Sequence, residues 1–422
     1  MPHRAIPNAA GESGLMVFLQ RKSNFQALLA VCVVGVVIVY FEMIKLSSVM
    51  PQMSDTSILE NLRRNQATAK PVFGEGASPS IGVVLTHYRD NEECMQTLQS
   101  LYDTAQYSVS IHIYLFEEVE LGSNDDTTCF QLLCQTSPSI CEYHATRIHH
   151  KRRHAADHIG PGPARAIAES MVVQSRHKYF LSITTRLEFT PRWDVAVLAQ
   201  WTSIGNPKAL LSFAPPAVRS KEWPTDSSQQ AILCTGRITS IQSNIAVVAF
   251  NLPVLIADPR TSTPRLVSQY SEDFLFGPIK ALIEAPSDPN VEFVWEGLAY
   301  YRAVRWWTRG YDFYSPTTDV VFEKYTRRVQ HPLHPSLIHT IASDDTAMAR
   351  LVARQKESYI RIRRVLRFNS GEPPSSKDEM YSIGSTRSLE QWVAFSGLNH
   401  NAKKDESTDR QFQNCRKLVR VA

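Results

Sequence analysis

A strand–helix–strand pattern between residues 81 and 116 constrains the fold of this chain more than any other feature. The run IGVVLTHY from Ile81 is short, apolar and followed by turn-forming residues, which predicts a buried strand. Asp90 or Asn91 then caps a helix with one apolar face, and a second apolar run, SIHIYLF, ends near Phe116. Two strands joined by a helix at this spacing pair in parallel, so the sequence predicts an α/β fold.

Later segments extend this pattern. Apolar runs at 178–183, 209–213 and 245–250 predict further strands, separated by helical or irregular stretches. A long basic helix over 347–368 and a short helix over 388–395 follow. In α/β sheets ligands bind at the carboxyl ends of the strands, so we expect the functional site at that edge.

An uncharged run, Ala27–Phe41, predicts a membrane span over residues 25–44 when its apolar neighbours are added. More positive charge precedes the run than follows it, which favours a cytoplasmic tail at 1–24 and a lumenal location for the rest. The chain is therefore predicted to be a single-pass type II membrane protein of the Golgi or the endoplasmic reticulum. A cleaved signal peptide or a buried core helix is the alternative interpretation of the run.

The remainder of the chain divides into three predicted parts. Residues 45–79 are polar, contain three prolines and show no sustained apolar period, which predicts a solvated stem. Residues 80–398 carry the α/β pattern. Residues 399–422 are polar and charged and predict a disordered tail.

Six of the seven cysteines lie beyond the predicted span, where an oxidising lumen would permit disulfides. Cys129, Cys134 and Cys141 are clustered, so we expect one disulfide among them, with its connectivity open. The neighbouring histidines follow no recurrent ligand spacing, so no zinc site is predicted.

The charge balance argues against a polyanionic partner. Lys and Arg number 45 against 41 Asp and Glu, a net charge of +4. The most basic stretch, RIHHKRRHAADH at 147–158, lacks interleaved aromatic residues, so nucleic-acid binding is not predicted. Gly160 and Gly162, which follow it, lack the third glycine of a dinucleotide-binding fingerprint.

Six segments carry a family resemblance. They are HYRDNEECMQTLQSLYDTA at His87, GPGPAR at Gly160, YFLSITTRLEFTPRWD at Tyr179, FLFGPIKALIEAPSDP at Phe274, WTRGYDFYSP at Trp307 and YSIGSTRSLEQWVAFSGL at Tyr381. In this order they resemble the polypeptide α-N-acetylglucosaminyltransferase family. The resemblance implies a Rossmann-like nucleotide-sugar glycosyltransferase fold of the GT-A type. It also implies transfer of N-acetylglucosamine from UDP-GlcNAc to a hydroxyl of a polypeptide or glycoprotein acceptor.

The resemblance also implies donor-binding residues. Arg89 and Asp90 match family residues that meet the nucleotide, although the same pair would suit a helix N-cap and a surface ion pair. Arg165, in the GPGPAR segment, matches a residue that approaches the donor. Gly297 matches the glycine of the family's Gly-Glu-Glu motif. The basic stretch before Gly160 would then lie over the donor phosphates or attract an acidic acceptor, and its alternative is a solvated loop.

The chain departs from the family at the metal-binding positions. Where the family carries an acid, a spacer and a His or second acid, which hold Mn²⁺ or Mg²⁺, this chain carries Thr184, Thr185 and Arg186. A neutral hydroxyl binds a hard cation weakly and a guanidinium repels it, so metal binding in the family manner is not predicted. Thr184 and Arg186 are predicted to face the donor, where Arg186 could offset the diphosphate charge. Glu323 stands where the family often has a metal-binding His, and alone it makes no site.

The acidic pair of the family is also replaced. The resemblance places its two glutamates on Leu298 and Ala299, while Glu296 stands one residue early. Glu296 or Asp312 is therefore the predicted base for the acceptor's proton, although Asp312 could instead cap backbone amides in a turn. Two functions stay open: an active glycosyltransferase, and a catalytically inactive relative that binds a sugar nucleotide, a glycoprotein or an active paralogue.

Overall fold

The computed structural model describes residues 80–120, 127–218, 230–241, 245–256, 263–325, 345–368, 376–401 and 413–421. All of them lie in one compact unit, Thr68–Ala422. The predicted cytoplasmic tail, membrane anchor and stem, residues 1–79, fall outside the described residues. Within the described ranges, no helix combines the length and the apolar character that a membrane crossing needs.

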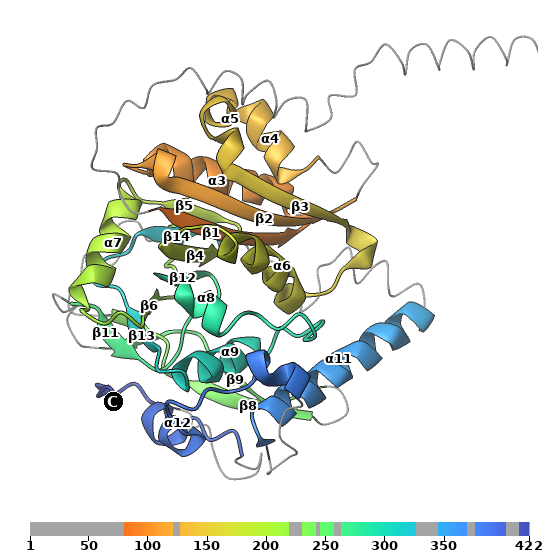
Figure 1. Cartoon of the computed structure of the whole chain (residues 1–422), viewed down its shortest axis with the longest axis vertical. Helices are drawn as coiled ribbons and strands as arrows, with labels where there is room; N and C mark the ends of the chain where they lie inside the picture. Colours follow the sequence, from red (N-terminus) through yellow and green to blue (C-terminus); the bar gives the residue numbers. More distant parts are fainter. Residues whose placement is uncertain are drawn as a thin grey trace, which may run out of the picture. The chain divides into compact units, whose positions relative to one another are not determined.

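A mixed sheet of eight strands forms the centre of this unit, in the order β11-β13-β6-β12-β4-β1-β2-β3 (Figure 1). The strands are β1 (Ile81–Tyr88), β2 (Ile111–Val119), β3 (Ile148–His154), β4 (Tyr179–Ile183), β6 (Ala209–Ser212), β11 (Arg265–Val267), β12 (Phe274–Pro278) and β13 (Asp312–Ser315). β1 is parallel to both β4 and β2, and β2 is parallel to β3. The α/β fold predicted from residues 81–116 is confirmed.

One strand reverses direction inside the sheet. β12 is antiparallel to both of its neighbours, β4 and β6, whereas β6 and β13 are parallel to each other. The ends of β4 and β6, at Ile183 and Ser212, therefore lie at the same edge of the sheet as the ends of β1, β2 and β3. Asp312 pairs with Ala209 at the start of β6 and so lies at the opposite edge.

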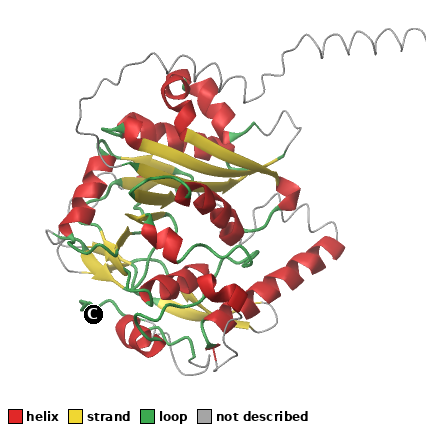
Figure 2. Cartoon of the chain, viewed as in Figure 1, coloured by secondary structure: helices red, strands yellow, loops and turns green. Residues whose placement is uncertain are grey.

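Helices cover both faces of the parallel half of the sheet (Figure 2). α6 (Pro161–Val173) packs against β1 and β2 on one face. α3 (Asn91–Thr104) lies on the other face, and α4 (Cys129–Thr136) and α5 (Pro138–His144) follow beside it. Because β1 is covered on both faces, its apolar residues form a continuous run instead of alternating with polar ones.

The remaining described elements are helices, short 3₁₀ helices and two-stranded sheets. The helices are α7 (Trp193–Ser203), α8 (Lys280–Glu284), α9 (Leu298–Trp307), α11 (Asp345–Val365) and α12 (Leu389–Ser396), with short 3₁₀ helices η1 (Ser108–Ser110), η2 (Ala145–Arg147), η3 (Ala155–Asp157) and η7 (Ser376–Tyr381). Two-stranded sheets join β5 (Leu187–Phe189) to β14 (Val321–Glu323), β7 (Gln230–Ile232) to β10 (Val254–Ile256) and β8 (Gly236–Ile241) to β9 (Ile245–Phe250). The strand predicted at 245–250 is confirmed as β9, but it pairs with β8 and not with the main sheet.

The largest core cluster surrounds α9, which is buried on nearly every face. Trp306, Trp307 and Trp392 are fully buried, and the rings of Trp307 and Trp392 meet edge to face at 5.4 Å. Trp306 Nε1 donates to the carbonyl of Ala281 at 3.0 Å, so this buried indole keeps a hydrogen bond. The core therefore fixes α9 and the loop that enters it at Gly297.

Three disulfides join the described cysteines, Cys94–Cys129, Cys134–Cys141 and Cys234–Cys415. The second confirms the disulfide expected in the cysteine cluster. The third corrects the prediction of a disordered tail for residues 413–421. That segment is covalently tied to Cys234, and Asn414 is buried with its backbone N–H donating to the Cys234 carbonyl at 2.7 Å.

Candidate functional site

A cavity of about 780 Å³ opens at the carboxyl ends of β1, β2 and β3, the edge at which a ligand was expected. Its volume lies in the range of small-molecule sites. Tyr88 and Arg89 line it at the end of β1, Glu120 after β2 and Arg153 in β3. The rest of the wall comes from η3, Phe293 and the first turns of α11.

The cavity lining combines cations with aromatic rings. Its arginines are Arg89, Arg153, Arg350 and Arg354, and its acids are Glu120 and Asp157. Arg354 forms an ion pair with Glu292, and its guanidinium lies 5.3 Å from the ring centroid of Phe293. The ring of His158 lies 4.5 Å from Tyr88 and meets Phe293 edge-on at 5.9 Å. Such a lining suits a ligand with a planar part and a negative charge.

His158 is held in one orientation at this cavity. Its Nδ1 lies 2.7 Å from Glu118 Oε2, and Glu118 is almost completely buried in β2. The other oxygen of Glu118 accepts a hydrogen bond from the backbone N–H of Ile159 at 3.2 Å. Because a carboxylate only accepts hydrogen bonds, the network assigns a proton to Nδ1.

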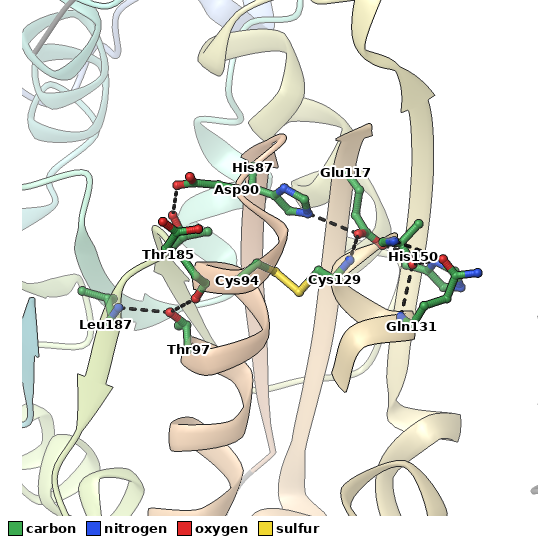
Figure 3. The surroundings of a disulfide bond; sticks show 12 residues. His87, Asp90, Cys94, Thr97, Glu117, Cys129, Gln131, His150, Thr185 and Leu187 are labelled. Carbon is green, nitrogen blue, oxygen red and sulfur yellow. Dashed lines mark hydrogen bonds and ion pairs between the residues drawn. A yellow bond between two sulfur atoms is a disulfide. The ribbon is translucent and has the colours of Figure 1, made fainter. Parts of the chain in front are cut away.

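An ion pair lies at the end of β4. Arg186 Nη2 donates to both carboxylate oxygens of Asp90 at 2.9 Å, and Thr185 Oγ1 donates to the same carboxylate at 2.9 Å. Figure 3 shows Asp90 and Thr185 meeting beside α3. Arg186 has a left-handed backbone with φ 71°, and Arg89 has φ 52°. Asp90 and Arg186, both predicted to face the donor, therefore bind each other.

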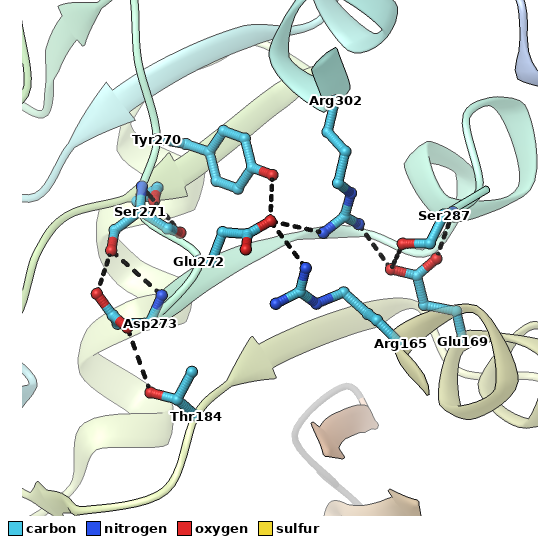
Figure 4. A network of polar contacts seen from close by, with 10 residues as sticks. Arg165, Glu169, Thr184, Tyr270, Ser271, Glu272, Asp273, Ser287 and Arg302 are labelled. Carbon is cyan, nitrogen blue, oxygen red and sulfur yellow. Dashed lines mark hydrogen bonds and ion pairs between the residues drawn. The ribbon is translucent and has the colours of Figure 1, made fainter. Parts of the chain in front are cut away.

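Two more carboxyl groups lie at this edge. Thr184 Oγ1 donates to Asp273 Oδ1 at 3.4 Å (Figure 4), and Glu323 pairs with Leu187, the residue after Arg186. Burial, and then repulsion from Asp273, raises the pKa of Glu323 to about 7. Burial also raises the pKa of Asp273. A carboxyl group that titrates near neutrality can exchange a proton in a reaction, so Glu323 is a candidate acid or base.

The polar atoms at the end of β4 are of mixed type. Thr184 offers a hydroxyl and Arg186 a cation, while the carboxylate of Asp90 is bound to Arg186, and the carboxyl groups of Asp273 and Glu323 lie at the same edge. In the described part of the chain, one group has metal-ligand spacing: His87, Cys94 and Cys129, with ligand atoms within 4.8 Å of one another. Its two sulfurs form a disulfide and offer no thiolate (Figure 3).

Arg165 belongs to a buried polar network shown in Figure 4. Its Nη1 donates to Glu272 Oε1 at 2.8 Å, and Arg302 lies between Glu272 and Glu169, donating to the latter at 2.6 Å. Although burial opposes ionisation, Arg165 and Arg302 hold the pKa of Glu272 below its usual range. The side chain of Arg165 is 7% exposed and its charge is balanced inside the fold, and its contact with a donor stays a prediction.

Residues 118–402, well over half of the chain, match the protein family described as Glycosyltransferase (GlcNAc). The chain belongs to this family. No curated protein matches it significantly in sequence.

Several solved structures resemble the fold of this glycosyltransferase domain at low identity. GalNAc-T7 with UDP, GalNAc and Mn²⁺ is 11% identical with a TM-score of 0.42, and the alignment covers 76% of this chain and 57% of that chain. The mannosyltransferase PcManGT from Pyrobaculum calidifontis, in complex with GDP-Man and Mn²⁺, is 10% identical with a TM-score of 0.37, covering 82% and 79%. TarS from S. aureus in complex with UDP is 10% identical with a TM-score of 0.35, covering 58% and 61%.

The glycosyltransferase domain places Glu296 and Gly297 beside the cavity but outside its lining. Glu296 accepts from Arg237 Nη2 at 2.9 Å, and both side chains are about half exposed. Gly297 begins α9 with φ 83° and packs against Val247, where a side chain would be strained. The loop that contains both residues carries Phe293, which does line the cavity.

Asp312 lies far from this site. It opens β13 at the opposite edge of the sheet and is completely buried. Arg387 Nη1 and Arg420 Nε donate to its carboxylate at 2.7 and 2.8 Å, and Asn206 Nδ2 donates at 3.1 Å. Asp312 is bound by two arginines at the edge opposite the cavity, so the geometry lends its predicted catalytic role no support, and that role stays a prediction.

Sequence reasoning missed Glu118, His158 and Asp273. A signal for Glu118 was present in the run HIYLFEEV, because consecutive acids inside a strand buried on both faces need specific partners. Its partner His158 lies 40 residues away and was noted only as part of the basic stretch. Asp273 had no local signal.

Proposed function

We propose that this protein transfers N-acetylglucosamine from UDP-GlcNAc to a hydroxyl of a polypeptide or glycoprotein acceptor, on a GT-A-type fold. The observation that carries the proposal is the cavity at the carboxyl ends of β1, β2 and β3, with its arginines and aromatic rings. Family membership supplies the class of reaction. The resemblance of six segments to polypeptide-modifying relatives supports this donor and acceptor.

In this proposal the donor nucleotide lies in the cavity in a single orientation. The planar base would lie against Tyr88, His158 and Phe293, where rings already contact one another. The diphosphate would meet the guanidinium groups that line the cavity, since arginine forks match phosphate oxygens. Arg89, between Tyr88 and Asp90, joins the cavity to the ion pair at the end of β4.

In this proposal Arg186 takes the place of a metal cation beside the leaving diphosphate. Asp90 occupies Nη2, and Nε is enclosed with Glu93 Oε1 at 3.9 Å. Nη1 is held in place by these ion pairs and can stabilise charge that develops as the glycosidic bond breaks. Transfer should therefore proceed without a divalent metal.

Glu323 is the carboxyl group that we propose as the acceptor's base. It is half-buried next to the backbone of Arg186, whose carbonyl accepts from Lys324 N at 2.9 Å. Its pKa of about 7 balances the amount of free carboxylate against proton affinity at neutral pH. This replaces Asp312 and Glu296, whose positions are less suited to the task.

We place the enzyme in the lumen of the Golgi or the endoplasmic reticulum as a type II membrane protein. Supporting this, all six cysteines beyond residue 44 form disulfides, which persist in oxidising compartments. Protease treatment of sealed microsomes tests the orientation: the domain should be protected until detergent is added. Digestion in sealed vesicles would contradict it.

Turnover of UDP-GlcNAc by the purified full-length protein tests the transferase proposal. UDP release should require a polypeptide acceptor or water, persist in EDTA and fall at least tenfold in Arg350→Ala, which removes one of the cavity's guanidinium groups. Arg364→Ala, on the same helix but outside the cavity lining, is the matched control and should keep full activity. Release that depends wholly on added Mn²⁺ would contradict the role given to Arg186.

A second function is favoured by one observation. The carboxylate of Asp90 already compensates the charge of Arg186, which weakens the attraction that the strand end exerts on a diphosphate. An inactive relative that binds a sugar nucleotide would need only the cavity. Calorimetric titration with UDP-GlcNAc separates the two, because binding without any UDP release supports the inactive relative and turnover excludes it.

A further inference from the structure

We infer that His158, oriented by Glu118, reads the nucleobase of the donor and selects uracil over cytosine. This inference rests on the proposed binding of a nucleotide in the cavity. It assigns the preference for a uridine nucleotide to one nitrogen atom, His158 Nε2.

The surroundings of His158 place its ring against a planar ligand. Tyr88 and Phe293 both lie next to the ring, with centroids at 4.5 and 5.9 Å, and all three residues line the cavity. Trp295 approaches at 6.3 Å, and Leu351 of α11 closes the apolar part of the lining. A base that enters this end gains stacking from the rings, and stacking alone does not distinguish one pyrimidine from another.

The hydrogen-bond network leaves one polar atom of the ring for recognition. Nδ1 is bound to Glu118 Oε2, whereas Nε2 has no hydrogen-bond partner in the described structure and is not enclosed. An imidazole that carries its single proton on Nδ1 presents Nε2 as an acceptor. The site therefore presents an acceptor next to its stacking surfaces.

An acceptor at this position distinguishes the two pyrimidines. Uracil carries a proton on N3 and can donate to Nε2. Cytosine carries a lone pair on N3, so two acceptors would face each other and both would lose hydrogen bonds to water. We expect a preference of about tenfold or more for uracil, because tenfold is about 1.4 kcal/mol and a missing partner in a partly buried site costs about 1–3 kcal/mol.

Glu118→Gln tests the inference with a change of base preference, which a purely structural role of Glu118 would not produce. The backbone N–H of Ile159 requires an acceptor, so the amide oxygen of the introduced glutamine would face it and the amide NH₂ would face His158 Nδ1. Nδ1 must then accept, the proton moves to Nε2, and the ring presents a donor to the base. The preference should therefore shift from uracil toward cytosine.

The experiment measures the dissociation constants of UDP and CDP by calorimetry on the full-length protein. Wild type should bind UDP about tenfold or more tightly than CDP, and His158→Ala should bind both with similar affinity. Glu118→Gln should bind CDP at least as tightly as UDP. His149→Ala, which removes an imidazole of β3 outside the cavity lining, is the matched control and should keep the wild-type ratio.

Two results would overturn the inference: equal affinities of wild type for UDP and CDP, or an unchanged ratio in both His158→Ala and Glu118→Gln. If one variant does not fold, the ratio of the UDP and CDP dissociation constants in the other variant decides. The outcomes also separate this inference from the transferase proposal. If the preference for UDP depends on His158 but no sugar is transferred, the inference stands and the transferase proposal fails. If sugar is transferred but the ratio of the UDP and CDP dissociation constants does not depend on His158, the transferase proposal stands and the inference fails.

Discussion

Glu323→Gln should make the protein more stable at alkaline pH and leave its stability nearly unchanged at acidic pH. Glu323 is half-buried at the end of β14, and burial followed by repulsion from Asp273 raises its pKa from 4.5 to about 7. The folded protein thus holds this proton more tightly than the unfolded chain. The stabilisation is fully present below pH 4.5 and is lost as the pH rises through 7.

The size of the effect follows from the pKa difference. Each unit corresponds to 1.36 kcal/mol, so the ionisation of Glu323 removes about 3 kcal/mol of unfolding free energy above pH 8, of which about 2.5 kcal/mol is lost between about pH 5 and pH 8. Glutamine has the shape of the protonated acid and cannot ionise. The variant should therefore gain about 2.5 kcal/mol over wild type between these two pH values.

Urea denaturation of wild type and Glu323→Gln, with disulfides intact, measures the difference in unfolding free energy between them at about pH 5 and at about pH 8. Glu357→Gln, at an exposed position of α11, controls for the loss of one negative charge. An equal difference between Glu323→Gln and wild type at both pH values would refute the reasoning. The same variant should lose transfer activity if Glu323 is the base.

Three further changes test individual contacts. Asp312→Ala should lower the unfolding free energy by about 3–5 kcal/mol in urea, because it leaves the buried Arg387 and the half-exposed Arg420 without their carboxylate, and UDP affinity should stay unchanged. Cys415→Ser should release the segment joined to Cys234, seen as faster tryptic cleavage within residues 413–421 and a stability loss of about 2–4 kcal/mol. Gly160→Ala should lower the melting temperature, because φ is 85° and the new Cβ would lie 2.5 Å from the backbone nitrogen of Phe293; a cost below about 1 kcal/mol would contradict this clash.

The periodicity of apolar residues in the sequence predicted several helices and strands. The apolar run from Ile81, the helix after Asp90 and the strand ending near Phe116 appear as β1, α3 and β2, because strand and helix periodicity reflects burial within each segment. The helices expected at 347–368 and 388–395 appear as α11 and α12. The disulfide in the cysteine cluster spans a separation of 7 residues and was equally predictable.

Residue types at the candidate site were visible in the sequence, but their partners were not. Arg186 and Asp90 are 96 residues apart and Glu118 and His158 are 40 apart, and each pair forms only because parallel strands bring their carboxyl ends to one edge. The pKa of Glu323 depends on burial and on Asp273, neither of which its neighbours in sequence specify.

The sequence by itself determined the α/β fold, the edge of the sheet at which the cavity opens and, through residues 118–402, the glycosyltransferase family. The tertiary structure alone decided that Asp312 and Arg165 are bound by opposite charges, that His158 lines the cavity, and that Glu323 pairs with Leu187 beside Arg186. The physical reason is that residue chemistry and periodicity act over a few positions, whereas enclosure, charge compensation and proton affinity depend on side chains that meet only after the chain has folded.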